Sequence, residues 1–182
     1  MPVIPLLPQD IGEPRDLVAA IRARRGGTLL NLDRMLLYSP PFAAGWNGFL
    51  RAVRTELEVP PRLRELAICA VAILNGADYE FRQHAPEYLK AGGTQAQLAA
   101  VRRLARPDGG PDSAAAFDAG ERAVIALAVA MTRSVEVARA TMDSVRAALP
   151  SDRQLVEIVG VIAAYNMVSR FLVALHVEPE GE

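Results

Sequence analysis

The densest group of side chains able to exchange protons lies between residues 65 and 84. Glu80 and His84 are four residues apart, so they share one face of a helix. Glu65 lies on the preceding apolar segment, and a tight turn between two helices would bring it towards His84 if the register allows. A carboxylate beside an imidazole fixes its tautomer and raises its basicity, which suits a proton relay near neutral pH. We therefore take His84, Glu80 and Glu65 as candidate catalytic residues.

A weak surface pair is the plain alternative for Glu80 and His84, because exposed pairs at this spacing contribute little. The preceding segment is nearly all apolar, so its end should be buried, and a buried histidine beside carboxylates needs an explanation. Cys69, midway along that segment, is expected to be a small buried hydrophobe.

Four polar side chains are candidates for holding a substrate: Arg170, Arg82, Tyr79 and Asn166. Asn166 and Arg170 are four residues apart in an otherwise apolar stretch, and a buried arginine needs a carboxylate partner or an anionic ligand. The alternative for Arg170 is a structural ion pair with one of the two glutamates, or a pair at an interface.

Composition excludes several classes of site. The chain has one cysteine, so it has neither an internal disulfide nor a Cys-X-X-Cys centre, and its two histidines lack a three-ligand metal spacing. It has no glycine-rich phosphate loop and no nucleophilic serine motif. We therefore expect no metal and no cofactor.

Charge and hydropathy favour a cytosolic protein. The formal net charge of −1 comes without a clustered basic face, so nucleic acid is not an expected partner. The proline-rich start does not read as a signal peptide. The apolar run at residues 66–74 is shorter than the roughly 20 residues that cross a bilayer. We expect a cytoplasmic protein that does not bind membranes.

Apolar spacing is helical throughout, which predicts an all-α fold. The predicted helices cover residues 14–25, 28–38, 41–56, 61–76, 79–91, 94–105, 115–134, 136–148 and 152–175. Ser39, Asp78 and Thr94 are possible caps, and residues 106–113 should form a loop. The antiparallel pair at 61–76 and 79–91 is the core of this fold.

Three stretches of the chain form a recognisable pattern. They are Leu63-Arg64-Glu65-Leu66-Ala67-Ile68, Leu74-Asn75-Gly76-Ala77-Asp78-Tyr79-Glu80-Phe81-Arg82-Gln83-His84 and Ala91-Gly92-Gly93. They resemble the signature helix pair of the carboxymuconolactone decarboxylase and alkylhydroperoxidase D family, and Tyr165-Asn166-Met167-Val168-Ser169-Arg170-Phe171 looks like the tail of its members. The resemblance implies a helical domain at residues 40–178, after an arm with short helices at 1–39. It also implies trimers or hexamers, sometimes dimers, with sites near subunit contacts.

In the alkylhydroperoxidase D branch, the resemblance implies a relay glutamate before a Cys-X-X-Cys and a histidine four residues after the second cysteine. Here Glu65 takes the glutamate position and His84 the histidine position, while the cysteine positions fall on Ala77 and Glu80. Peroxide reduction by thiols needs a thiolate and a resolving thiol, and Cys69 cannot replace both. We therefore disfavour an alkylhydroperoxidase-like antioxidant activity.

The decarboxylase branch moves protons without a cofactor while a carboxylate leaves a lactone. The run Tyr79-Glu80-Phe81-Arg82-Gln83-His84 differs from that branch's characteristic sequence. The leading hypothesis is a homo-oligomeric, cofactor-independent acid–base enzyme, lyase-like, that acts on a small organic acid or lactone. The antioxidant protein and a non-catalytic oligomeric helical binding protein are the alternatives.

Overall fold

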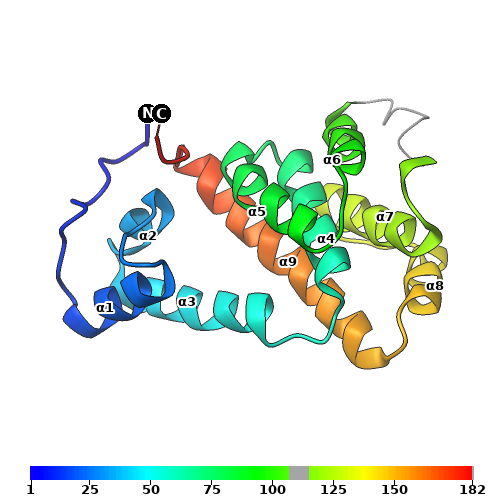
Figure 1. The fold of residues 1–182 in the computed structure, drawn as a ribbon, viewed down its shortest axis with the longest axis horizontal. Coiled ribbons are helices and arrows are strands. Elements are labelled where there is room, and N and C mark those ends of the chain that lie inside the picture. Colours follow the sequence, from blue (N-terminus) through cyan, green and yellow to red (C-terminus); the bar gives the residue numbers. More distant parts are fainter. Residues whose placement is uncertain (107–114, 182) are drawn as a thin grey trace. The chain divides into compact units, whose positions relative to one another are not determined.

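The computed structural model describes residues 1–106 and 115–181, and those residues form helices and loops without a strand (Figure 1). The helices are α1 (Arg15–Arg24), α2 (Asn31–Leu36), α3 (Pro40–Thr55), α4 (Pro61–Leu74), α5 (Asp78–Lys90), α6 (Gln95–Arg102), η1 (Arg103–Ala105, a 3-10 helix), α7 (Ala119–Arg133), α8 (Arg139–Ala148) and α9 (Asp152–Ala174). The predicted all-α fold is confirmed, and the helix ends differ from prediction by a few residues. The predicted loop at 106–113 lies outside the described residues except for its first residue.

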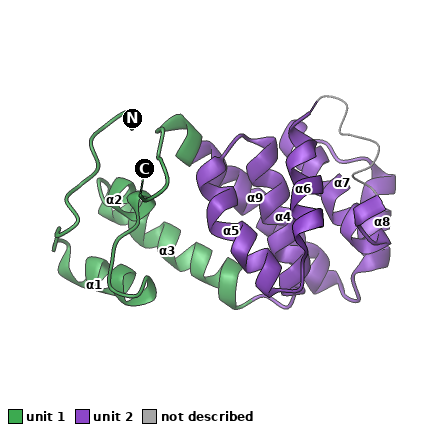
Figure 2. Cartoon of the chain, turned by 45° about the horizontal axis from the view of Figure 1, so that its top comes forward, with its two compact units in different colours: residues 1–56, 172–182 green, residues 57–171 purple. Residues whose placement is uncertain are grey.

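The chain divides into two compact units, which Figure 2 colours separately. Unit 1 comprises residues 1–56 and 172–182, and unit 2 comprises residues 57–171. The sequence analysis drew its boundary between residues 39 and 40. The structure groups α3 with unit 1, because α3 packs against α1 and α2.

Helix α4 is the central helix of unit 2. Eight consecutive residues, from Glu65 to Ala72, are buried, so this part of the helix is covered on every face. Helices α5, α6 and α7 all pack against it. A helix that is apolar all round suits such a position, whereas a charged side chain there requires a partner.

A tight turn joins α4 to α5 and sets their antiparallel arrangement. The backbone N–H of Gly76 donates to the carbonyl of Ile73 at 3.2 Å, and that of Ala77 donates to Ala72 at 2.8 Å. These two bonds form a Schellman motif, which ends the helix and satisfies its last carbonyl groups. Gly76 has φ of 66°, a left-handed conformation that favours glycine.

The predicted caps have different outcomes. The Thr94 hydroxyl accepts from the backbone N–H of Gln97 at 3.2 Å, so the predicted cap of α6 is confirmed. Asp78 does not cap α5; it is the first helical residue, and its carboxylate pairs with Arg82 at 2.6 Å. Ser39 occupies the N-cap position of α3, but its side chain makes no capping hydrogen bond.

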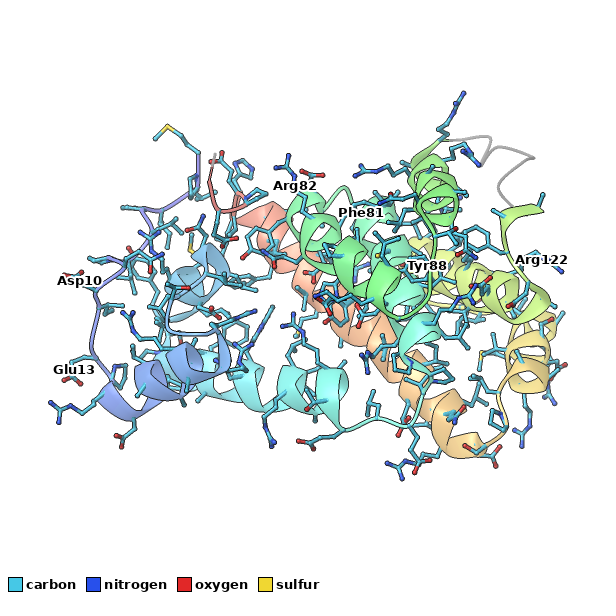
Figure 3. All side chains as sticks on the ribbon, viewed as in Figure 1. Asp10, Glu13, Phe81, Arg82, Tyr88 and Arg122 are labelled. Carbon is cyan, nitrogen blue, oxygen red and sulfur yellow. The ribbon has the colours of Figure 1, made fainter. Side chains whose placement is uncertain are left out.

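A buried carboxylate, Glu121, ties four helices of unit 2 together. It is 1% exposed and lies 2.7 Å from a guanidinium nitrogen of Arg62 on α4. Tyr88 on α5 (Figure 3) donates its hydroxyl at 3.5 Å, and Gln97 on α6 donates its amide to both carboxylate oxygens at 3.2 and 3.1 Å. The backbone N–H of Asp118 donates at 3.0 Å and completes the capping box of α7. Such complete pairing is what keeps a buried charge tolerable.

In unit 1, α3 buries one face and exposes another. Trp46, Leu50 and Val53 are at most 6% exposed, as expected for its apolar face. Phe42 and Phe49 are 45% and 49% exposed, so within this chain they lie outside the core.

Helix α9 is long and apolar enough to cross a membrane, and it is the one such helix among the described residues. Half of its most apolar window is buried inside the protein. Core helices pass the same test, so this feature is weak evidence for a membrane span.

Gly93→Ala should destabilise the protein, because a Cβ there would overlap the fully buried ring of Tyr88. Overpacking of this kind costs about 1–3 kcal/mol. Urea denaturation followed by circular dichroism measures the change. Gly45→Ala is the control: its Cβ meets nothing within 4 Å, and replacing a helical glycine there should stabilise by about 0.5–1 kcal/mol. Equal free energies of unfolding for the two variants would contradict the role given to Gly93.

Candidate active site

The antiparallel helices α4 and α5 bring three of the candidate residues together. Glu65 lies on α4, while Glu80 and His84 lie one turn apart on α5. Their exposed fractions are 4%, 2% and 5%, so the surface-pair alternative does not hold. The expected approach of Glu65 to His84 is confirmed by a contact of 2.7 Å. We call these three residues the relay cluster.

Both nitrogens of the His84 ring face a carboxylate. Nδ1 lies 2.7 Å from Oε2 of Glu65, and Nε2 lies 3.1 Å from Oε1 of Glu80. An ionised carboxylate only accepts hydrogen bonds, and a neutral imidazole carries a single N–H. Two hydrogen bonds therefore need two protons, held either by an imidazolium or by a neutral ring beside one protonated carboxyl. Both distributions have a net charge of −1, so a proton can shift along the cluster without changing its total charge.

One end of the relay cluster is anchored. Oε1 of Glu65 accepts from Nε of Arg64 at 3.1 Å. Burial raises the pKa of the Glu65 carboxyl, but the hydrogen bond and charge of His84, together with Arg64, outweigh burial and hold that pKa below its usual value. The ring of Tyr165, fully buried on α9, meets the imidazole edge to face with centroids 5.0 Å apart. Glu65 is thus held as a carboxylate, and the imidazole plane is fixed.

The other end of the cluster has an unused oxygen. Oε2 of Glu80 is buried and has no hydrogen-bond partner among the described residues. Buried carboxylate oxygens are ordinarily satisfied, so an orphan of this kind marks a place for a proton or for a donor on a ligand. Within the described part of the chain, Glu80 therefore keeps one unpaired oxygen, whereas both nitrogens of the His84 ring already face a carboxylate.

The single thiol does not supply redox chemistry. Cys69 lies one helical turn after Glu65 and is fully buried, as expected. Burial raises the pKa of the Cys69 thiol far above its usual value, and the charges of Glu65 and Glu80 raise it further against the opposing effect of Arg102. The thiol is therefore protonated at neutral pH, and the thiol, unlike the thiolate, is a poor nucleophile.

The four predicted substrate-binding residues have different surroundings. Arg170 is exposed, so the expectation that it is buried and needs a counter-ion is wrong. Arg82 extends from α5 with half of its side chain exposed and pairs with Asp78 (Figure 3). Tyr79 is buried. Asn166 uses its amide to join neighbouring helices, and its partners are the side chains of Asn75 and Thr132 and the carbonyl of Ile162.

Sequence reasoning missed three parts of this arrangement. Arg64 was adjacent to Glu65 in the sequence, yet residues next to each other on a helix do not normally face each other. Tyr165 was noted without its contact to His84, which depends on how α9 packs. The Glu121 network carried a readable signal, since a capping box places Glu or Gln three residues after the cap. Over the described residues, no group of three or more His, Cys, Asp or Glu side chains is arranged to hold a metal ion.

Acid denaturation tests the anchoring of Glu65. Because its pKa is lowered in the folded state, it contributes stability above the ordinary glutamate pKa of about 4.3, and this contribution is lost as the pH falls through the lowered value. Glu65→Gln should therefore reduce the free energy of unfolding at neutral pH, and the difference from wild type should shrink below about pH 4. Urea titrations at a series of pH values measure this. The control Glu87→Gln changes an exposed glutamate of α5. Curves for Glu65→Gln and wild type that stay parallel would refute the assignment.

Comparison with known proteins identifies the fold. A solved structure of an uncharacterized peroxidase-related protein from Silicibacter sp. TM1040 is 20% identical, covers 99% of this chain and 94% of its own, and has a TM-score of 0.74. A variant of the debrominase Bmp8 in complex with 2,3,4-tribromopyrrole is 17% identical, with coverages of 100% and 95% and a TM-score of 0.77. An uncharacterized peroxidase-related protein with an AhpD core, from Ralstonia eutropha JMP134, is 17% identical, with coverages of 98% and 92% and a TM-score of 0.71.

At such low identities these structures establish the fold alone. Among proteins with curated annotation, none matches the sequence. Residues 40–121 match the sequence model of the carboxymuconolactone decarboxylase family, a range that runs from the start of α3 to the first turn of α7. The match to the carboxymuconolactone decarboxylase family over residues 40–121 and the AhpD-like fold of these solved structures agree with the resemblance seen in the sequence, which has no Cys-X-X-Cys motif.

Proposed function

We propose that this protein is a cofactor-independent acid–base enzyme, lyase-like, that acts on a small organic acid or lactone in the cytoplasm. The observation that carries the proposal is the unpartnered, buried Oε2 of Glu80 beside a histidine bonded on both nitrogens. A purely structural cluster would gain stability by satisfying that oxygen. A cluster that exchanges a proton with a ligand keeps that oxygen available to the ligand.

The relay cluster would supply one proton in a decarboxylation. The bond between the substrate carbon and its carboxylate breaks, CO2 leaves, and the bonding electrons enter a conjugated carbonyl or lactone of the substrate. Before this step the cluster holds a third proton, on Oε2 of Glu80, in addition to the two on the His84 ring. Glu80 donates the Oε2 proton to the resulting carbanion or enolate and His84 passes its Nε2 proton to Oε1, which leaves the two-proton form with a neutral ring beside a protonated Glu80. The imidazole keeps the Nδ1 proton that Glu65 accepts, and a proton from solvent restores the cluster. One positioned acid or base of this kind supplies about 10²–10⁴-fold in rate.

The decarboxylation proposal predicts that Glu80 and His84 are both required. With carboxymuconolactone and related unsaturated lactone acids as the panel, Glu80→Gln and His84→Ala should each lower CO2 release by about 10²-fold or more. Glu87→Gln changes an exposed residue of the same helix and should retain wild-type turnover. Circular dichroism confirms that each variant is folded.

Three results would decide against this reaction. Undiminished turnover in Glu80→Gln removes Glu80 from the chemistry. A folded wild type that turns over no member of the panel favours the non-catalytic binding protein. Hydroperoxide consumption with a dithiol reductant, abolished in Cys69→Ser, would restore the antioxidant alternative.

The proposal includes a homo-oligomer, as the family resemblance implies. Val156, Ala163 and Met167 lie on one face of α9 at spacings of seven and four, and all three are exposed. An exposed apolar stripe on a helix that is half buried in its own chain is typical of a subunit contact. We infer that a second copy of the chain covers this stripe.

Light scattering during size-exclusion chromatography tests the oligomer. The wild type should have a mass that is a multiple of 19.6 kDa, with a trimer or hexamer expected and a dimer as the smaller option. Met167→Glu should lower the mass, because it places a charge in the contact. Val135→Glu is the control, since Val135 is 99% exposed outside α9. A monomeric wild type, or equal masses for both variants, would contradict the stripe as an interface.

A further inference from the structure

A cavity of about 530 Å³ lies between α1 and α3 within unit 1. Its size falls in the range of about 300–1,000 Å³ that is usual for small-molecule sites. Two faces meet there: Leu17 and Ile21 of α1 are apolar, while Asn47 and Thr55 of α3 are polar. Every residue of the lining belongs to unit 1, so this cavity is a site distinct from the relay cluster.

Three arginines line the cavity: Arg24 from α1, with Arg51 and Arg54 from α3. The described lining includes no acidic side chain. Asp33 lies outside the lining, and Arg25 holds it more closely, at 3.0 Å, than Arg24 does at 3.5 Å. Glu56 pairs with Arg51 at 2.6 Å, and both side chains are about half exposed or more. The described lining itself is therefore cationic, because it holds three guanidinium groups and no carboxylate.

The environment of Arg24 supports that conclusion. Burial lowers the pKa of its guanidinium, and the neighbouring cations Arg25 and Arg54 lower it further, while Asp33 acts in the opposite direction. Arg24 also donates to the side-chain oxygen of Asn47 at 2.6 Å, which fixes its position at the cavity. A partly exposed cation among other cations gains from an anion that can accept several of its N–H groups.

We propose that this cavity binds a small amphipathic organic carboxylate, with its carboxylate among Arg24, Arg51 and Arg54 and its apolar part against Leu17 and Ile21. Guanidinium groups present paired donors that match the two oxygens of a carboxylate. The apolar floor distinguishes this ligand from an inorganic anion, which would leave that surface uncovered. The site is separate from the proposed reaction and takes a ligand whether or not that reaction occurs.

Octanoate is the probe, titrated into the full-length protein by isothermal titration calorimetry. Saturable binding is expected, and it should weaken with added salt because ionic attraction contributes. Affinity should stay constant between about pH 6 and pH 9, since guanidinium groups do not titrate there. Octanol, which has the same chain without charge, should bind at least about tenfold more weakly.

A matched pair of glycine variants locates the site. Gly48 lines the cavity and Gly45 does not, yet both lie on α3 and a Cβ on either would meet nothing within 4 Å. Gly48→Leu should fill the cavity mouth and raise the octanoate Kd at least about tenfold, while Gly45→Leu should leave it within about twofold. Since both changes replace a helical glycine, neither is expected to unfold the chain.

A second pair tests the charge. Arg51→Met should raise the Kd at least about tenfold, while Arg15→Met, at an exposed arginine outside the lining, should change it little. His84→Ala should retain octanoate affinity, which separates this site from the relay cluster. No saturable octanoate binding, equal binding of octanol, an unchanged Kd in Gly48→Leu, or equal losses in both arginine variants would each overturn the proposal.

Discussion

The burial of a carboxylate in the central helix is the constraint on which unit 2 depends. From Glu65 to Ala72, α4 is covered on all sides, so a charge at Glu65 cannot reach bulk water. His84 and Arg64 supply its hydrogen bonds, and His84 lies on α5, across the turn at Gly76. A shift in the register of α5 against α4 would leave Glu65 unpaired in the core, which costs several kcal/mol. The same contact that makes the cluster chemically interesting therefore also fixes how the helix pair packs.

In unit 2 the buried carboxylates of Glu65 and Glu121 are both paired, but their partners differ in chemistry. Glu121 is held by an arginine, an amide, a phenol and a backbone N–H, none of which gives up a proton near neutral pH. Glu65 is held by a histidine, whose ordinary pKa lies near neutral and which reaches a second carboxylate. The partners of Glu121 can only stabilise the fold. The partners of Glu65 can also move a proton, and this difference is the reason for assigning chemistry to one carboxylate and structure to the other.

How much could be predicted depended on whether the signal was local. The helical spacing of apolar residues predicted the pair α4 and α5. The four-residue separation of Glu80 and His84 predicted that they share one helical face. The sequence of α9 does not show that Arg170 is exposed, because polarity and exposure do not coincide along this helix. Met167, for example, is exposed although it is apolar. Apolarity shows which faces of a helix can be buried, but the neighbouring helices decide which faces are. The contact between Gln97 and Glu121 could not be predicted either, because it depends on how α6 and α7 pack. Each capping box by itself is a local pattern that can be recognised in the sequence.

The position that holds the second cysteine in the alkylhydroperoxidase D branch bears on which chemistry this chain retains. The resemblance places that thiol at Glu80, within contact of the histidine, and Glu80 keeps that contact at 3.1 Å. A carboxyl and a thiol both hold one exchangeable proton, so the substitution preserves a proton donor beside His84. It removes the two-electron chemistry of sulfur, and Ala77 at the other position removes the resolving partner. Under the proposed function, the chain retains proton transfer without thiol oxidation, and this is why the proposal favours a decarboxylase over a peroxidase.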